Sequence, residues 1–384
     1  MEPSLCYLIS KRFIILLCLY TFLFTSILSS THPLCHENES SALLQFKQSL
    51  EIIEPTKIAS WKLGGDNTDC CLWEGVDCDE NSGHVIGLDL SNSNLYGSIN
   101  SSSTLFQLVH LQSLNLALND FNYSEIPARI GQLSRLKYLN LSSSVFSGNV
   151  PSETSQLANL SSFDLSYNFD FGGNGNYILK LGIDFTLENL VRNFTKLEYL
   201  DLSFVEITST VPQIMSNLSS PKSLVLIDCG LSGEFPISIF HLPDLRILKL
   251  DDNKDLNGHL PEFQVKSPLE IISLPETNFS GKLPTSIGNL RSLVDFNTYQ
   301  CKFFGSIPAQ LGNLKSVTSM DLFGNRFSGL VPSSIGNLTE LRFLRLGYNQ
   351  LTGPFPPQIL NLSKLTYLYL AKNNFQGPIP IYNT

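Results

Sequence analysis

A pair of apolar residues flanking one variable residue recurs through most of this 384-residue chain. The first residues of these pairs are Leu88, Leu114, Leu139, Phe163, Leu200, Leu224, Leu248, Ile272, Phe296, Met320, Leu344 and Leu368. From Leu200 onward each step is 24 residues, and the earlier steps are 26, 25, 24 and 37 residues. A unit of this size is too small to bury its own apolar face, so neighbouring units must bury it by stacking. The spacing therefore predicts one elongated solenoid of about twelve units over residues 84–384.

Each unit is expected to begin with a short strand. Leu344 and Leu346 point into the core because alternate strand residues share a face, and Arg345 points to the opposite face. Successive strands then form one parallel sheet with a spacing of about 4.8 Å. The second half of a unit, as in Gly329-Leu-Val-Pro332, combines a tight glycine turn with a proline that ends hydrogen bonding, so it forms only a short strand or bridge. The expected fold is a right-handed curved superhelix with a concave parallel β-sheet, an irregular or 3-10 convex side and short second β-bridges.

The fifth residue after the start of each pair is polar in every unit but one. These residues are Ser93, Asn119, Ser144, Asn168, Cys229, Asn253, Thr277, Cys301, Asn325, Asn349 and Asn373, and the exception is Val205. Since buried backbone groups need hydrogen-bond partners, we expect these side chains to satisfy the backbone where it leaves the sheet. Cys229 and Cys301 would lie three strands apart, about 14 Å, which is too far for a disulfide. Both are interpreted as structural, with reactive thiols as the alternative.

The first 30 residues have the features of a secretory signal. Lys11 and Arg12 precede an apolar stretch from Phe13 to Phe24, and small residues follow it. The alternative is a membrane anchor, but the apolar stretch is shorter than the roughly 20 residues that a spanning helix needs. The sequence thus predicts export.

Four cysteines, Cys35, Cys70, Cys71 and Cys78, follow the predicted signal and indicate disulfides in an exported protein. Four cysteines allow three pairings. Joining the neighbours Cys70 and Cys71 would strain the bond, and we favour Cys35–Cys70 with Cys71–Cys78. A zinc site is the alternative, disfavoured by the oxidising compartment and by the lack of a second Cys-x-x-Cys pair.

A helix is expected in the same segment. Leu43, Phe46 and Leu50 would share one of its faces, with Ser40 or Ser41 as N-cap.

These motifs resemble those of a known superfamily. The Asn/Gly/Ile-Pro form of the 24-residue unit, from His84 to Pro380, is similar to the plant-specific leucine-rich repeat, and residues 31–83 resemble its helical, disulfide-bonded N-terminal cap. Residues 166–193 add 13 residues to the usual spacing, and the segment Arg192–Pro212 after them is similar to one in the plant leucine-rich-repeat receptor-like proteins. That resemblance implies a membrane-anchored sensor of pathogen or developmental cues. Because the repeats reach Thr384 without a C-terminal cap, we expect a truncated ectodomain.

Three hypotheses for function follow. The first is extracellular ligand recognition in defence or developmental signalling, at the outer face of the plasma membrane in the full-length protein or in the apoplast for the chain as given. Its partners would be a protein, peptide or glycan ligand and a co-receptor kinase. The second is a secreted, wall-associated enzyme inhibitor resembling the polygalacturonase inhibitors. The third is a nonfunctional fragment or decoy.

Charge and motif content exclude other classes. The formal net charge of −9 argues against binding to nucleic acid or to anionic lipid. The six histidines are scattered among different units, at positions 32, 36, 84, 110, 241 and 259, and no hydrolase or metalloprotease motif is present. The glycine cluster Gly172–Gly175 lacks the residues of a phosphate loop and is interpreted as a flexible loop. We therefore predict no enzyme activity, no cofactor and no catalytic or metal-binding residues.

Two groups of surface residues are expected to matter in an ectodomain. N-glycosylation acceptors occur at Asn38, Asn100, Asn122, Asn140, Asn159, Asn193, Asn217, Asn278, Asn337 and Asn361. The predicted ligand face consists of aromatic and basic residues of the last units, because such residues are typical of binding hot spots. They are Tyr299, Phe323, Phe343, Arg345, Tyr348, Tyr367, Tyr369 and Lys372. A more acidic strip precedes them at Asp228, Lys249, Asp251, Asp252 and Glu276.

Overall fold

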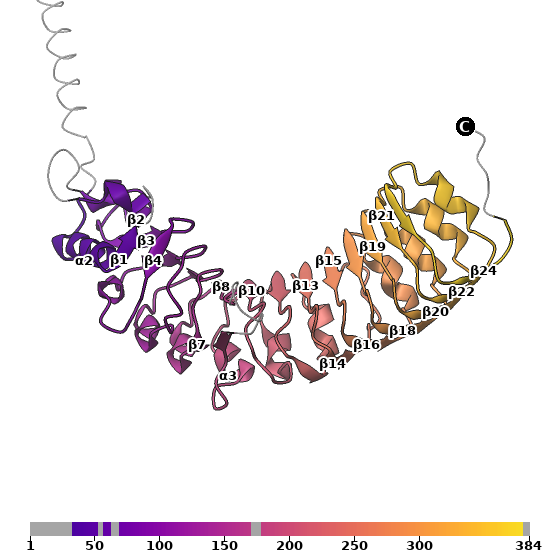
Figure 1. Cartoon of the computed structure of the whole chain (residues 1–384), viewed down its shortest axis with the longest axis horizontal. Helices are drawn as coiled ribbons and strands as arrows, with labels where there is room; N and C mark the ends of the chain where they lie inside the picture. Colours follow the sequence, from indigo (N-terminus) through magenta and orange to yellow (C-terminus); the bar gives the residue numbers. More distant parts are fainter. Residues whose placement is uncertain (1–32, 53–56, 63–68, 170–177, 379–384) are drawn as a thin grey trace, which may run out of the picture.

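The computed structural model describes residues 33–52, 57–62, 69–169 and 178–378, which form a curved arc with the N-terminal cap at one end (Figure 1). The short strands of the repeats lie side by side along the arc. None of the helices in these ranges is long and apolar enough to cross a membrane. The predicted signal segment lies outside the described residues.

The main sheet contains 13 strands among the described residues. They are β2 (Val76–Cys78), β3 (Val85–Asp89), β5 (Ser113–Asn115), β6 (Tyr138–Asn140), β8 (Ser162–Asp164), β10 (Tyr199–Asp201), β11 (Ser223–Val225), β13 (Ile247–Lys249), β15 (Ile271–Ser273), β17 (Asp295–Asn297), β19 (Ser319–Asp321), β21 (Phe343–Arg345) and β23 (Tyr367–Tyr369). Every pairing is parallel except that of β2 with β3. The parallel register joins the first residues of the recurring pairs, from Leu88–Leu114 to Leu344–Leu368, which confirms the spacing used to find the repeats.

A second sheet of seven strands runs beside the later repeats. Its strands are β12 (Ser232–Glu234), β14 (Asp255–Gly258), β16 (Asn278–Gly281), β18 (Lys302–Gly305), β20 (Arg326–Gly329), β22 (Gln350–Gly353) and β24 (Asn374–Phe375). Two small pairs complete the strands: β1 (Leu50–Ile52) with β4 (Leu95–Gly97), and β7 (Gly148–Asn149) with β9 (Leu179–Lys180). The second half of each unit therefore forms only short strands, as the glycine and proline pattern predicts.

Single 3-10 turns connect the strands. They are η1 (Lys57–Ser60), η2 (Cys70–Leu72), η3 (Thr104–Gln107), η4 (Ala128–Gln132), η5 (Ser152–Gln156), η6 (Gln213–Asn217), η7 (Ile237–His241), η8 (Thr285–Asn289), η9 (Ala309–Asn313), η10 (Ser333–Asn337) and η11 (Pro357–Asn361). A proline stands directly before most of these turns, where its fixed φ and missing N–H are tolerated.

The cap is built around helix α2 (Glu37–Gln48) and two disulfides, Cys35–Cys70 and Cys71–Cys78, which is the pairing favoured from the sequence. Strand β2 joins the cap to the main sheet by pairing with β3.

The expected N-cap of the cap helix was wrong. Helix α2 begins at Glu37 with His36 as N-cap, so Ser40 and Ser41 lie within the helix. The helix ends before Leu50, which belongs to β1, although Leu43, Phe46 and Leu50 are all buried as expected.

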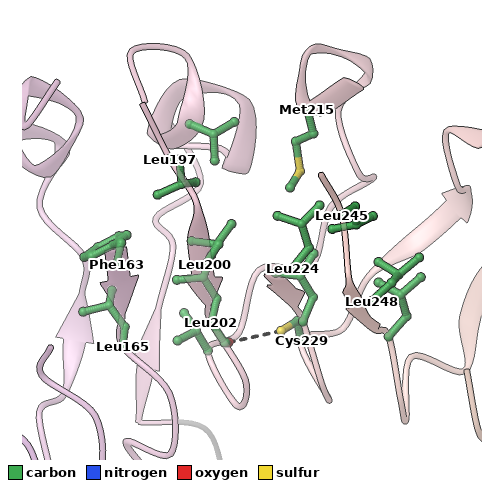
Figure 2. Close-up of a cluster of buried hydrophobic side chains, with 14 of the residues drawn as sticks. Phe163, Leu165, Leu197, Leu200, Leu202, Met215, Leu224, Cys229, Leu245 and Leu248 are labelled. Carbon is green, nitrogen blue, oxygen red and sulfur yellow. Dashed lines mark hydrogen bonds between the residues drawn. The ribbon is translucent and has the colours of Figure 1, made fainter. Parts of the chain in front are cut away.

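The core is a continuous row of side chains contributed by neighbouring repeats (Figure 2). Leu200, Leu224 and Leu248 are each at most 1% exposed and are register partners of the equivalent residues of the repeats on both sides. Burying one such leucine contributes about 1.5–3 kcal/mol, and none of it is available to an isolated repeat.

The polar ladder forms as predicted. The Asn349 Nδ2 group donates to the carbonyl oxygens of Leu322 (2.8 Å) and Leu346 (3.1 Å), and its Oδ1 accepts from the Phe327 N–H (2.9 Å). The Cys229 thiol donates to the Leu202 carbonyl at 3.2 Å in the same way (Figure 2). Each of these side chains thus ties two repeats together.

The extra residues of the long repeat leave the main sheet undisturbed. Phe163 and Leu200 are direct register partners although they are 37 residues apart. The described part of residues 166–193 contains β9 and a short helix, α3 (Leu187–Val191), which begins with a capping box between Thr186 and Asn189. The glycine cluster 172–175 lies outside the described residues.

Candidate functional site: an aromatic cleft on the concave sheet

Five of the predicted ligand-face residues form one cluster, which we call the aromatic cleft: Tyr299, Phe323, Arg345, Tyr348 and Tyr369. Together with Gln300 and Gly324 they line a shallow hollow of about 740 Å³. Phe323 is central, because its ring lies 5.2 Å from Tyr299, 4.8 Å from Tyr348 and 5.7 Å from Tyr369, measured between ring centroids.

The repeat backbone positions these rings. Arg345 and Tyr369 are register partners on β21 and β23, so their side chains leave the same face of the sheet. Tyr348 precedes the ladder residue Asn349 and has a φ of 51°, in the left-handed region that side-chain-bearing residues rarely adopt. The same left-handed turn occurs at Gln300 (φ 52°) and Gly324 (φ 71°), so it belongs to the repeat.

Gly347 gives Tyr369 room to lie flat on the sheet. A Cβ atom at position 347 would lie 2.4 Å from ring carbons of Tyr369, far inside van der Waals contact. A larger residue there would push the ring out of its present place.

A buried ion pair fixes the arginine at the floor of the cleft. The Arg345 Nη1 group donates to Asp321 Oδ2 at 2.8 Å, and the Asp321 side chain is 9% exposed. The guanidinium also stacks on Phe323 and Tyr299, with its carbon 4.3 Å and 5.0 Å from the two ring centroids. Burial raises the pKa of Asp321, and the charge and hydrogen bond of Arg345 act in the opposite direction. The floor is therefore an ion pair without net charge. It is bordered by the exposed ring of Tyr348 and by the half-buried rings of Tyr299, Phe323 and Tyr369.

Three predicted residues lie outside the cleft. Phe343 and Tyr367 stack on each other at 4.8 Å, two residues before Arg345 and Tyr369 on the same strands, and form a separate aromatic pair on the same face. Lys372 is exposed and does not line the hollow.

A row of partly buried carboxylates on the earlier strands was not singled out from the sequence. Asp164 and Asp201 are register partners on β8 and β10, and Asp295 lies on β17. Burial raises the pKa of all three, that of Asp201 to about 6. The signal was present for Asp164 and Asp201, because each lies between two core residues of its strand and must face the concave side. Asp295 instead precedes the core residue Phe296 and lies two residues earlier in the strand register.

Two carboxylates of this acidic region are incompletely paired. Asp251 accepts a hydrogen bond from Ser273 on Oδ2, but its Oδ1 and the Oδ1 of Asp295 are buried and without a hydrogen-bond partner among the described residues. Burial raises the pKa of both carboxyl groups, and the charge of Lys249 acts in the opposite direction.

The predicted glycosylation acceptors are distributed unevenly. Asn217, Asn337 and Asn361 are exposed at the ends of 3-10 turns. Asn140 is different, because it lies in β6 of the main sheet and its side chain contacts Tyr138 and Ser142. A glycan on Asn140 would cover the N-terminal part of the concave face and leave the aromatic cleft open.

The two free cysteines are buried in the polar ladder. Burial is the main cause that raises the pKa of both thiols, that of Cys301 to about 11. Each thiol donates to a backbone carbonyl, Leu202 for Cys229 and Leu274 for Cys301, which supports the structural interpretation.

Comparison with known proteins agrees with this architecture. Residues 36–79 match the family model described as leucine rich repeat N-terminal domain, and residues 315–375 match that described as leucine rich repeat. The fold and these matches define a leucine-rich-repeat protein with its N-terminal capping domain.

Proteins of similar sequence narrow the class of leucine-rich-repeat protein. The chain is 41% identical over 281 residues to receptor-like protein 6 of Arabidopsis thaliana, covering 69% of this chain and 28% of that protein. It is 34% identical over 301 residues to receptor-like protein Cf-9 of Solanum pimpinellifolium, covering 73% and 33%. By sequence the chain therefore belongs with the plant leucine-rich-repeat receptor-like proteins, and it spans about a third or less of the length of these relatives.

Solved structures show the same fold. The Arabidopsis receptor kinase HAESA, in complex with the peptide hormone IDA and the co-receptor SERK1, matches with a TM-score of 0.68 and 26% identity over 88% of this chain and 62% of that chain. A TDR receptor matches with a TM-score of 0.60 and 26% identity over 78% of this chain and 45% of that chain.

Proposed function

We propose that this chain is a ligand-recognition segment of a plant cell-surface receptor, that it binds an extracellular peptide on its concave face, and that it performs no catalysis itself. The aromatic cleft is the observation that carries the proposal. Aromatic rings that are exposed or half-buried around a fixed arginine are the composition of a binding hot spot. The relatives and the peptide complex of HAESA support this assignment, as does the predicted signal segment.

The face also favours a particular ligand. The aromatic cleft suits an apolar or aromatic side chain, whereas the acidic region around Asp201, Asp251 and Asp295 suits a basic one. Strands β13 and β21 are four strands apart, about 19 Å at the usual spacing. An extended peptide of about six residues spans that distance, so the ligand would carry its apolar and basic groups about six residues apart.

A co-receptor kinase would complete the signalling unit, and the complex of HAESA with the co-receptor SERK1 supports such a partner. The cleft leaves the convex turns and the second sheet uncovered by ligand, and these surfaces remain accessible to such a partner.

The experiment is a selection from a phage-displayed library of random 12-residue peptides on the glycosylated, secreted protein. Peptides selected on the unmodified protein are then tested by biolayer interferometry against Phe323→Ser, and against Phe304→Ser as the matched control. Phe304 is 45% exposed on β18 of the second sheet, whereas Phe323 is half-buried, so the control removes a solvent-accessible phenylalanine that lies outside the cleft. The proposal expects at least tenfold weaker binding for Phe323→Ser alone. Peptides that bind both variants equally, or a selection that enriches none, would contradict it.

A further inference from the structure

Three histidines that the sequence places in different units meet where the cap joins the first repeats, which corrects the expectation that the histidines are scattered. His36 is the N-cap of α2, His84 directly precedes β3, and His110 lies between η3 and β5. The three imidazole rings stack, with centroids 3.9 Å apart for His36–His84 and 3.6 Å for His84–His110.

A single buried carboxylate faces two of these rings. Glu39 of α2 is 2% exposed, and its Oε1 lies 3.3 Å from Nδ1 of His84 and 3.3 Å from Nδ1 of His110. Its other oxygen, Oε2, accepts the Val85 N–H at 2.9 Å. The backbone thus holds one oxygen of Glu39 and aims the other at the two imidazoles.

We propose that Glu39, His84 and His110 form a binding site for a divalent transition-metal ion of the zinc type, which fastens the cap to the first two repeats. Two imidazoles and a carboxylate are a preferred ligand set for Zn²⁺. The three ligand atoms already lie within 4.8 Å of one another. The carboxylate supplies the negative charge and the imidazoles supply neutral nitrogen.

The distances between the nitrogen and oxygen atoms match the spacing of ligand atoms around a metal ion. With bonds of about 2.05 Å, the ligand atoms of a tetrahedral zinc site are about 3.3 Å apart. Both Nδ1···Oε1 distances have this length, whereas a charge-assisted N–H···O⁻ bond is about 2.7–2.9 Å. An ion could therefore bind between these three atoms once the two imidazole rings have turned their Nδ1 atoms toward it.

Solvent access to the two histidines and the backbone hydrogen bond to Glu39 are also compatible with a metal site. The side chains of His84 and His110 are 28% and 24% exposed, so an ion can reach them from solvent, while Glu39 stays buried. The Val85 N–H orients the carboxylate, as outer partners of metal ligands usually do. In-plane coordination by both nitrogens requires the two rings to open from their 22° interplanar angle.

A bound ion would cross-link the cap to the first two repeats. Glu39 is separated from His84 by 45 residues and from His110 by 71, so a shared ion closes two large loops across the first repeats. A metal ion that binds only the folded arrangement stabilises it by mass action.

The test uses the secreted chain with its disulfides intact, any affinity tag removed, and ZnCl₂ as probe in isothermal titration calorimetry. We expect one Zn²⁺ per chain with micromolar or tighter affinity, and at least tenfold weaker binding for His84→Gln and for His110→Gln. The controls are His241→Gln and His259→Gln, which remove exposed histidines elsewhere and should leave binding unchanged.

Two further measurements distinguish the loss of a metal ligand from a loss of the folded structure. His36→Phe keeps a ring stacked on His84 but removes no proposed ligand, so it should bind Zn²⁺ normally. Replacing Zn²⁺ by Co²⁺ should give the visible absorption of a tetrahedral site in the unmodified chain and not in a folded His110→Gln variant. Equal Zn²⁺ affinity in the unmodified chain and in both ligand variants, or no stoichiometric binding by the unmodified chain, would overturn the proposal.

Discussion

Arg345 lies over the ring of Phe323, with its guanidinium carbon 4.3 Å from the ring centroid, while the same guanidinium binds Asp321 at 2.8 Å. Asp321 and Phe323 both belong to the neighbouring repeat. The arginine therefore links the carboxylate at the floor of the cleft to an aromatic ring at its edge. Each contact restricts the other, and the cleft is therefore shaped before any ligand arrives.

Arg345→Met tests the buried ion pair. It leaves the Asp321 carboxylate buried and unpaired, and we expect a loss of about 2–4 kcal/mol in the free energy of unfolding. The double variant Asp321→Asn with Arg345→Met should recover most of that loss, because no charge remains buried. Arg246→Met is the control, since its partner Glu270 is 39% exposed and the pair should contribute less than about 1 kcal/mol. Urea unfolding measures all three, and equal losses for Arg345→Met and Arg246→Met would contradict the account.

Asn349→Ala tests the polar ladder. It removes the partners of the Leu322 and Leu346 carbonyls and of the Phe327 N–H, all buried between repeats. Leaving such groups unsatisfied costs about 1–3 kcal/mol each, so we expect a loss of at least about 3 kcal/mol. Hydrogen exchange should accelerate in the repeats on both sides. The exposed neighbour Gln350→Ala is the control, and an Asn349→Ala protein with unaltered exchange would count against the ladder as a stabilising element.

Asp201→Asn tests the acidic row. Burial is the main cause that raises the pKa of Asp201 to about 6, so the folded chain holds this proton more tightly than the unfolded chain does. The contribution of protonated Asp201 to the free energy of unfolding is fully present below pH 4 and is lost as the pH rises through about 6. Asparagine keeps an acceptor for the Ser203 N–H without the charge. We therefore expect Asp201→Asn to be more stable by about 1–3 kcal/mol at pH 7 and equal to the unmodified chain at pH 4.

Unfolding at both pH values measures this difference. Asp244→Asn, at an exposed position, serves as the control. A stabilisation by Asp201→Asn that is the same at pH 4 and pH 7 would show that charge burial is not its cause.

Thiol labelling tests the interpretation of Cys229 and Cys301. Both are buried and their pKa values are raised, so neither should react with a maleimide in the folded protein at pH 7. In denaturant without reductant, mass spectrometry should find both labelled. Cys301→Ser should cost less than about 1.5 kcal/mol, because a hydroxyl also donates to the Leu274 carbonyl. Rapid labelling of either cysteine in the folded chain would favour the reactive-thiol alternative.

The sequence predicted most of the architecture because contacts in a solenoid join equivalent positions of neighbouring repeats, and these positions recur at a nearly constant spacing. The register partners Phe163 and Leu200 follow from the apolar pairs alone, even across the long repeat. The start of α2 was misplaced, because His36 caps the helix without a side-chain hydrogen bond and leaves no sequence signal.

The sites were less predictable than the fold. Strand alternation identified the residues of the aromatic cleft. It did not predict that Phe343 and Tyr367 form a separate pair, because all these residues share one face and differ only by two residues along the strand. The meeting of His36, His84 and His110 could not be read from spacing, since it depends on how the irregular cap docks onto the first repeats.

A hydrogen-exchange footprint of a selected peptide on the secreted protein tests the central claim most directly, because each of the last repeats carries one strand in each sheet. The account predicts slower exchange in residues 319–324, 343–349 and 367–371, which carry the aromatic cleft, and no change in residues 302–305, 326–329 and 350–353 of the second sheet. Slower exchange confined to the second sheet, or to residues 178–193, would contradict it.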